Sequence, residues 1–449
     1  MELLKEVLEK IKPSEEERAV VNAVTKEIVD IAEEEIEKRK LDVTPRLVGS
    51  IAKDTYLSGD HDVDLFLAFP LEVPLEELRK AGLELGKAIG KRLGSYEIAY
   101  AEHPYVRALY RGFEVDIVPC YNVKSWREVK TAVDRSLLHT EWVISHLNGK
   151  NDEVRLLKKF LKGINAYGSE VYVRGFSGYL TELLIIKYDS FMNLLENVEF
   201  LGKSKIIDLE GWLKKEPEIA YKTVEREKER PLVVIDPVDP RRNVASALSW
   251  EKFGVFYFKA MEFIESPRIE FFFPSRAKAE DYKSLIREKG TNLVTLLFPK
   301  PELVDDVLLP QLERSAKGLE KSLRREGFEV FDSNWGYAEK AFIMLEVDRV
   351  ERPRVILKPG PELLSERALD FYAKNQKVWI RGKQLYSEKR VKESIVDVIE
   401  ELLAKNQVAL GRNLREPIKN AEILINLVPP ELEEEAYLFL SKEKWNIKG

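Results

Sequence analysis

The sequence has very few residues that bind soft metals or form disulfides. Cys120 is the single cysteine, which excludes an internal disulfide and a cysteine-rich zinc site. Only four histidines occur, so any bound metal is expected to use oxygen ligands. No run approaches the roughly 18 consecutive apolar residues of a membrane-spanning helix. The start, "MELLKEVLEKIKPSEEER", is typical of an amphipathic helix rather than a signal peptide, so we expect a cytoplasmic protein that enters no membrane.

An excess of positive charge is also lacking. The formal net charge is −6, whereas a dedicated nucleic-acid-binding domain is usually basic. This excludes a chain that is basic throughout, but it allows an enzyme with a local basic groove. A length of 449 residues, of which 44% are hydrophobic, predicts about two to four domains with separate cores.

The order of hydrophobic patterns predicts an α+β multidomain protein. In residues 1–150 we expect a helix at 14–39 with a capping box in "SEEE", strands near 45–49 and 61–69, a helix opened by Pro74, and strands within 96–121 that turn at Arg111-Gly112. Residues 151–268 are mostly helical in pattern, with one strand-like stretch, "PLVVIDP". In residues 269–449 short strands alternate with helices. We therefore predict three domains with these boundaries.

Two aspartates set two residues apart are the strongest chemical signal. Asp62 and Asp64 lie in an apolar run, "DVDLFLAF", so their side chains project from one face of a strand. Adjacent carboxylates repel one another unless a cation neutralises them, and Mg²⁺ prefers oxygen ligands. The preceding Gly49-Ser50 pair allows backbone amides and a hydroxyl to approach a phosphate.

A simpler alternative to a metal site is that Asp60, Asp62 and Asp64 form the solvated face of a strand. A third carboxylate helps to decide between the two. In "FEVDIVPCY", Asp116 lies on a second predicted strand, which could bring it to the same place. Three carboxylates on adjoining strands favour a two-metal site for phosphoryl transfer. Cys120, on the same strand, is expected to be a packing residue.

Further motifs follow in order: "AEHPYV", "AVDRSLLHTEW", "NDEVRLLKKFLKG", "VRGFSGYLTELLI", "IDPVDPRRNVASAL" and "LVDDVLLPQLERS". Together with "GS", "DVD" and "EVDIVP", they resemble the nucleotidyltransferase superfamily of DNA polymerase β, and in particular the archaeal class I CCA-adding enzymes. The similarity covers most of residues 1–330 and is less distinct beyond. The resemblance implies a polymerase-β-like head of mixed sheet and helices, a helical central neck, and an α+β body and tail.

The resemblance also implies a function, which is the template-independent addition of the 3′-terminal CCA of tRNA from CTP and ATP. Mg²⁺ would be held by Asp62, Asp64 and Asp116, while the 3′ hydroxyl of tRNA attacks the α-phosphate and pyrophosphate leaves. The residues at the family's triphosphate contacts are Ser50, Lys53, His139, Lys158 and Tyr167. Arg242, just after the "IDPVDP" turn, would read the incoming base. The family further implies a homodimer that binds the acceptor stem and 3′ end of tRNA.

Each residue assigned by resemblance has a structural alternative. Lys158 could lie on a solvated helix face, His139 and Tyr167 could be packing residues, and Arg242 could be a solvated side chain after a turn. The basic segments "RVERPRVILKPG" and "WIRGKQLYSEKR" could contact the tRNA backbone or could simply be solvated surface.

Two other functions stay open from the sequence. A poly(A) polymerase or an oligoadenylate-type synthase would share the carboxylates and differ in nucleotide choice. A non-catalytic RNA-binding protein on the same scaffold is a third class, but clustered carboxylates would repel RNA phosphates and argue against it.

Overall fold

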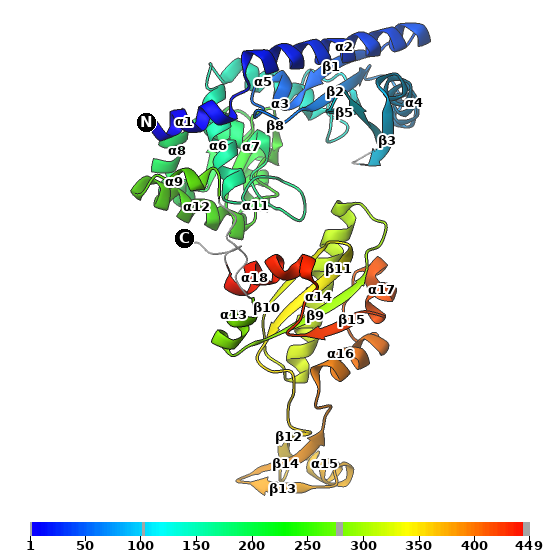
Figure 1. Ribbon diagram of the computed structural model, residues 1–449, viewed down its shortest axis with the longest axis vertical. Helices are drawn as coiled ribbons and strands as arrows, with labels where there is room; N and C mark the ends of the chain where they lie inside the picture. Colours follow the sequence, from blue (N-terminus) through cyan, green and yellow to red (C-terminus); the bar gives the residue numbers. More distant parts are fainter. Residues whose placement is uncertain (1, 101–103, 275–281, 443–449) are drawn as a thin grey trace. The chain divides into compact units, whose positions relative to one another are not determined.

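The computed structural model describes residues 2–100, 104–274 and 282–442. The chain divides into two compact units, Met1–Ser275 and Arg276–Gly449, each with its own buried hydrophobic clusters. Both units combine helices and sheets, which confirms the predicted α+β multidomain class (Figure 1). The boundary predicted near residue 150 falls inside the first unit, and the division into three domains stays a prediction.

A five-stranded mixed sheet forms the core of the N-terminal part of the first unit. In spatial order its strands are β1 (Thr44–Val48), β2 (Asp62–Phe69), β5 (Phe113–Tyr121), β4 (Pro104–Tyr110) and β3 (Ser95–Tyr100). β2 and β5 run parallel, and the other neighbours are antiparallel. The predicted strands and the turn at Arg111-Gly112, where both residues have positive φ, are confirmed. This parallel pair is the part of the sheet that carries the three aspartates.

Two long helices cover one face of this sheet, α2 (Glu15–Arg39) and α4 (Leu75–Leu93) (Figure 1). Their apolar side chains pack with Val63 and Val115, which alternate with the aspartates along β2 and β5. The capping box is only half formed, because Ser14 accepts a hydrogen bond from the Glu17 backbone but the Glu17 carboxylate bonds to Ser58, Gly59 and His61 instead. The aspartates are therefore left on the opposite face.

The rest of the first unit is mostly helical, as predicted. Its elements are α1 (Glu2–Ile11), α3 (Gly49–Ala52), α5 (Arg135–His146), α6 (Asn151–Gly163), α7 (Gly178–Tyr188), α8 (Phe191–Glu196), α9 (Val198–Ser204), α10 (Trp212–Lys215), α11 (Pro217–Glu227), α12 (Trp250–Glu265) and η1 (Ile269–Phe271). α12 begins at Trp250, because the side chain of Ser249 caps the helix there. Likewise α7 and α8 are separated at Asp189, whose φ is 74°.

A small sheet, which the sequence predicted only through "PLVVIDP", lies within this helical part. Its strands are β6 (Ile206–Asp208), β7 (Val233–Asp236) and β8 (Asp239–Asn243). The turn predicted from "IDPVDP" connects β7 to β8, and it places Arg241 and Arg242 on β8.

The second unit is built on a four-stranded antiparallel sheet. In order, its strands are β10 (Val330–Tyr337), β11 (Lys340–Val347), β9 (Asn292–Pro299) and β15 (Glu422–Ile425). One face packs on α14 (Asp305–Glu326), α16 (Ile395–Ala404), η2 (Arg412–Leu414) and α17 (Arg415–Lys419). The other face packs on α13 (Tyr282–Lys289), η3 (Pro430–Leu432) and α18 (Glu433–Ser441).

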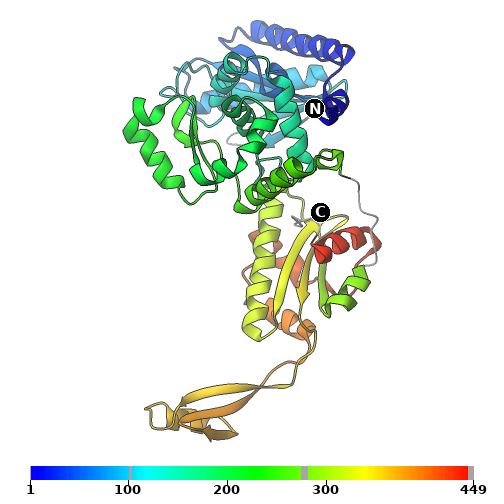
Figure 2. The same ribbon diagram turned by 90° about the vertical axis from the view of Figure 1, so that its left-hand side faces the viewer.

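A separate three-stranded sheet projects from this unit (Figure 2). We call it the tail sheet; it comprises β12 (Val355–Glu362), β14 (Gln384–Arg390) and β13 (Val378–Arg381), together with α15 (Ala368–Lys374). Among the described residues, no helix combines the length and the apolar composition needed to cross a bilayer.

Candidate active site

A polar cavity of about 380 Å³ lies in the first unit, on the face of the sheet that α2 and α4 leave uncovered. Eight of the ten site residues predicted from the sequence line it: Gly49, Ser50, Lys53, Asp62, Asp64, Asp116, Lys158 and Tyr167. The structure thus brings together predicted residues that range from Gly49, at the start of α3, to Tyr167, which follows α6. His139 and Arg242 do not line the cavity itself.

The three aspartates meet through the parallel pairing of β2 and β5. Asp64 lies directly opposite Asp116 in the register, and Asp62 lies opposite Glu114. Burial, and then the charge of Asp116, raises the pKa of Asp64 to about 6. Burial also raises the pKa of Asp62, followed by the charge of Asp60. The carboxylates therefore repel one another, as the sequence predicted.

Gly49 is required next to Asp64 for two reasons. Its φ is +73°, a backbone conformation that residues with a side chain rarely adopt. A Cβ at this position would also lie 1.9 Å from Oδ2 of Asp64. The glycine therefore leaves the space that the Asp64 carboxylate occupies.

The site residues fit a metal ion by the chemistry of their side chains, although they are not arranged around an ion. Among the described residues, no three acidic, histidine or cysteine side chains are placed to enclose an ion. Asp116 instead pairs with Arg107, whose Nε and Nη2 lie 2.7 and 2.9 Å from its two oxygens. Even so, three carboxylates around one cavity supply the hard oxygen ligands that a divalent cation prefers.

Two lysines also line the cavity, and they share one buried carboxylate. Lys53 Nζ lies 2.6 Å from Oε2 of Glu182, and Lys158 Nζ lies 4.0 Å from Oε1. Lys158 also donates to the carbonyl of Thr55 at 2.9 Å. Burial lowers the pKa of Lys158 to about 8. Because only 4% of the Lys158 side chain is exposed, the alternative of a solvated helix face is wrong.

A buried arginine fixes α6 to the loop that follows Lys53. The Arg155 side chain is 1% exposed, and its Nε donates to the carbonyl of Tyr56 at 2.9 Å. Its Nη2 lies 2.6 Å from both the carbonyl and the carboxylate of Asp54, and its Nη1 bonds to Asp152.

Tyr167 borders the same cavity, while Asp60 does not. Tyr167 is held by a backbone bridge to Phe176, and burial raises the pKa of its hydroxyl. Asp60 pairs with Lys162 at 2.6 Å on the surface. Asp60 therefore lies apart from the three aspartates that line the cavity.

His139 and Arg242 converge beside the cavity on one buried carboxylate, Asp236. Oδ2 of Asp236 lies 2.8 Å from His139 Nε2 and 2.9 Å from Arg242 Nη1. Burial alone raises the pKa of Asp236, but the charge and hydrogen bond of His139, together with Arg242, outweigh it and hold the pKa at about 2. The connection to the cavity is Tyr179, which lines it and stacks on the His139 ring at 4.0 Å.

Sequence reasoning did not identify Glu182, Asp236, Tyr179 or Arg107 as site residues. A signal existed for Glu182, since a lone carboxylate within the apolar helix "GYLTELLIIKY" must be paired if it is buried. Arg107 had no comparable signal, because its pairing with Asp116 depends on the register of β4 against β5.

Three family models match consecutive parts of the chain. Residues 26–139 match the nucleotidyltransferase domain, residues 152–273 match the second domain of tRNA nucleotidyltransferase, and residues 289–426 match the C-terminal domain of the CCA-adding enzyme. The first two matches together include all ten site residues predicted from the sequence.

Curated relatives named CCA-adding enzyme match most or all of the chain. The one from Thermococcus gammatolerans is 65% identical over 450 residues, covering 100% of this chain and 99% of the relative. The one from Pyrococcus abyssi is 58% identical, covering 99% of each. The one from Methanosarcina acetivorans is 39% identical, covering 82% of this chain and 80% of the relative. The chain therefore belongs to the CCA-adding enzymes, a family of nucleotidyltransferases.

Proposed function

We propose that this chain adds and repairs the 3′-terminal CCA of tRNA without a template, using CTP and ATP. The observation that carries the proposal is a single cavity that is lined by three aspartates and by two buried lysines. Nucleotidyl transfer requires both kinds of group, because carboxylates bind the metal ions and lysines bind the phosphate oxygens of a metal-bound triphosphate. The match to CCA-adding enzymes over the whole chain supports this choice of substrate.

In this proposal Asp62, Asp64 and Asp116 hold Mg²⁺. The chemistry that Mg²⁺ supplies when bound is a lowered pKa of the attacking hydroxyl and neutralisation of phosphate charge. The 3′ oxygen of tRNA forms a bond to the α-phosphorus, the bond from the α-phosphorus to the bridging oxygen breaks, and pyrophosphate leaves. Gly49 keeps the Asp64 carboxylate in place for this step.

The triphosphate binds between Ser50, Lys53, Lys158 and Tyr167 in our proposal. Two lysines share one carboxylate, Glu182, so these three side chains together carry one net positive charge, which phosphate oxygens can neutralise. Glu182 is itself fully buried, and it also accepts a hydrogen bond from Thr55 at 2.7 Å. It therefore acts as a positioning residue for both lysines.

Arg242 reads the incoming base, and His139 contacts the triphosphate. Only one edge of the Arg242 guanidinium is bonded to Asp236, and 36% of the side chain is exposed, so its other N–H groups can reach a base. Asp236 holds both side chains in place from behind.

The partners that belong to this proposal are the acceptor stem and 3′ end of tRNA, and a second copy of the chain in a homodimer. The setting we propose is the cytoplasm. The head (1–150), neck (151–268), and body and tail (269–449) remain the proposed division of labour, in which the last part binds tRNA.

The test is incorporation of each labelled NTP into a tRNA that lacks its last three nucleotides, in the presence of Mg²⁺. We expect two C and then one A, with no further addition, and a rate on the order of 10³-fold lower for Asp64→Asn. Asp42→Asn, an exposed residue away from the cavity, is the control and should match the wild type.

Two results would contradict the proposal. Unlimited addition of A would identify a poly(A) polymerase. Tight binding of tRNA without any incorporation would identify a non-catalytic RNA-binding protein.

A further inference from the structure

Two residues that line the first cavity have no role in the proposed function, Arg107 on β4 and Glu114 on β5. Glu114 lies two positions before Asp116, so both carboxylates project from the same face of the strand. In the parallel register Glu114 lies opposite Asp62, just as Asp116 lies opposite Asp64. The sheet therefore presents four carboxylates to the cavity, one more than the sequence predicted.

Arg107 brings a cation to this group of carboxylates. β4 pairs with β5 so that Arg107 lies directly opposite Asp116. Its Nε donates to one oxygen of Asp116 at 2.7 Å and its Nη2 donates to the other at 2.9 Å, so the planar fork holds both oxygens. Nη2 also donates to the hydroxyl of Tyr105 at 3.1 Å. Asp116 is therefore neutralised by a side chain of the protein itself.

A metal ion on Asp116 would meet this guanidinium. Both oxygens of Asp116 accept an N–H from Arg107, so a metal bound to either oxygen would come close to a second positive charge. Like charges at such a short separation repel one another strongly in a partly buried site. An arginine keeps its proton in proteins, so it cannot relieve the repulsion by becoming neutral. Arg107 must therefore move away from Asp116 if Asp116 is to hold Mg²⁺.

Glu114 is the partner to which Arg107 can move. Its Oε2 lies 3.9 Å from Nε of Arg107, and Glu114 has no other ion-pair partner in the described part of the chain. The exposed fraction of the side chain is 39% for Arg107 and 60% for Glu114, so both can change rotamer without disturbing the core. This exchange would keep the cation at the site and would need no movement of the strands.

We propose that Arg107 is a built-in counter-cation, which binds Asp116 when the site holds no metal and transfers to Glu114 when Mg²⁺ binds. The proposal rests on the proposed function only in that Asp116 is a ligand of Mg²⁺. In the first state Arg107 limits the repulsion among the carboxylates, and in the second its pairing with Glu114 keeps it away from the ion. Arg107 is thus a positioning residue that acts through Asp116, and it sets how tightly the enzyme binds the metal.

The first test measures metal binding by the full chain alone, without nucleotide or tRNA. The probe is Mn²⁺, whose free form gives an electron paramagnetic resonance signal, and Mg²⁺ is then added as a competitor. For Arg107→Gln we expect a Kd about tenfold lower than that of the wild type, because the competing charge is gone. The gain in melting temperature on adding Mg²⁺ should also be larger than in the wild type, which a merely structural role would not produce.

Arg111→Gln is the matched control for this test. It removes the same charge from the turn of the same hairpin, where Arg111 pairs with Glu27 at 3.1 Å and does not line the cavity. Its Kd for Mn²⁺ should stay within about twofold of the wild type. If Arg107→Gln binds Mn²⁺ no tighter than this control does, or if no variant binds Mn²⁺, the proposal is overturned.

The second test asks whether Glu114 acts through Arg107. Glu114→Gln should weaken Mn²⁺ binding about tenfold in the wild-type background, because Arg107 then has only Asp116 to pair with. In the Arg107→Gln background the same substitution should change the Kd by less than about twofold. If Glu114→Gln weakens Mn²⁺ binding equally in both backgrounds, Glu114 is a metal ligand or a simple charge, and the transfer of Arg107 is wrong.

Incorporation of CTP and ATP by the wild type is recorded alongside the metal titrations, because it separates the two proposals. A wild type that adds CCA, with an Arg107→Gln variant of unchanged affinity for Mn²⁺, refutes the counter-cation alone. A wild type that adds nothing refutes the proposed function, and the titrations still decide whether Arg107 competes with the metal.

Discussion

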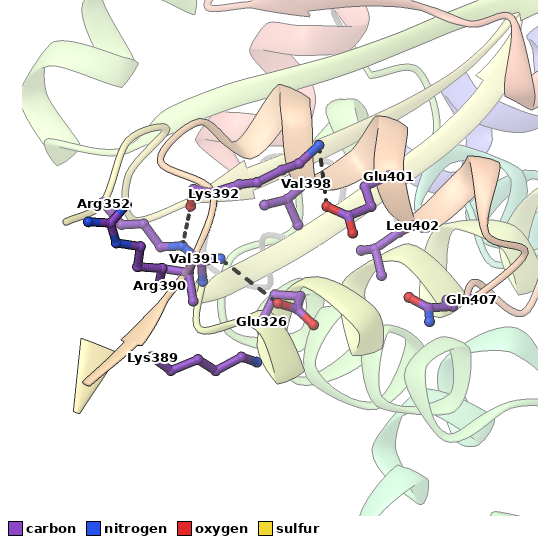
Figure 3. Close-up of a pocket in the computed structure, with 10 residues that line it drawn as sticks. All are labelled: Glu326, Arg352, Lys389, Arg390, Val391, Lys392, Val398, Glu401, Leu402 and Gln407. Carbon is purple, nitrogen blue, oxygen red and sulfur yellow. Dashed lines mark hydrogen bonds and ion pairs between the residues drawn. The ribbon is translucent and has the colours of Figure 1, made fainter. Parts of the chain in front are cut away.

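Two cavities, one in each unit, are nearly equal in volume, about 380 and about 370 Å³, but the charges they leave unmatched have opposite signs. In the first, Lys53 pairs closely with Glu182, whereas Asp62 and Asp64 form no ion pair among the described residues. In the second cavity, where the tail sheet joins α14 and α16 (Figure 3), Lys392 pairs with Glu401 and Arg352 with Glu326, whereas Lys389 and Arg390 form no ion pair among the described residues.

The difference shows that the kind of ligand can be inferred from the charged side chains that form no ion pair. Proteins pair buried charges wherever they can, because an unpaired one costs free energy. The groups left without a partner are therefore informative, and here they indicate a cation in one cavity and an anion in the other. Variants that change the unmatched groups, or the groups holding them, test this comparison.

Among the variants that leave the three aspartates themselves unchanged, Gly49→Ala is expected to have the largest effect, because its new side chain would displace the Asp64 carboxylate. The new Cβ would overlap Oδ2 of Asp64, and a displacement of about 1 Å in a reacting group can lower the rate about 100-fold. The measurement is single-turnover incorporation of CTP into tRNA lacking CCA.

The matched control is Gly59→Ala, where φ is +84° and no atom lies within 4 Å of the added Cβ. Both variants carry backbone strain, so both should lose some stability, but only Gly49→Ala should lose activity to this degree. Equal losses in the two variants would show that strain, and not the position of Asp64, is responsible.

A smaller effect is expected from Asp236→Asn, which removes the negative charge that pairs with His139 and Arg242 beside the first cavity. The amide cannot bond both His139 and Arg242 as an anion does, so kcat/KM for CTP and ATP should fall about 10- to 100-fold. Discrimination against GTP and UTP should fall as well.

Asp239→Asn is the control for this variant. Asp239 is equally buried and bonds to Arg135 and Arg241, but it has no contact with the cavity. It should cost stability while the choice of nucleotide stays as in the wild type. If both variants discriminate nucleotides normally, Asp236 does not position the base-reading arginine.

The smallest effect is expected from pH, which changes the charge of Lys158 in the first cavity but not that of Arg352 in the second. Burial lowers the pKa of Lys158 to about 8, so Lys158 is charged below that pH and becomes neutral above it. We expect kcat/KM for CTP to fall by up to about tenfold per pH unit above pH 8. Arg352 should not make the Kd for tRNA depend on pH in this range, because an arginine keeps its proton.

Lys158→Arg supplies the comparison, since its profile should lose the step near pH 8 whatever its absolute rate. A step that persists in this variant would belong to another group.

The sequence predicted contacts that depend on local periodicity, and it missed those that depend on folding over long distances. The two-residue spacing of Asp62 and Asp64 placed both on one face, and pairing of neighbouring strands brought Asp116 to them. By contrast, Glu182 meets Thr55 across 127 positions, and Asp236 meets His139 across 97. No spacing rule connects such residues, and the resemblance to a family, not periodicity, supplied Lys158 and His139.

The tail sheet was missed for a different reason. Val355, Ile356 and Leu357 follow one another on β12, and all three are between 39% and 51% exposed. A strand with both faces in solvent gives no alternation of apolar and polar residues, so its pattern resembles that of a loop.

The buried Arg155 has a mechanical consequence. It ties α6, which carries Lys158 one turn further on, to the loop that begins just after Lys53. Helix and loop therefore move as one piece, and the spacing between the two lysines stays constant when the rest of the unit flexes. A movement that separated α6 from this loop would break the hydrogen bonds of a buried guanidinium, so we expect any motion that admits a nucleotide to leave this contact intact.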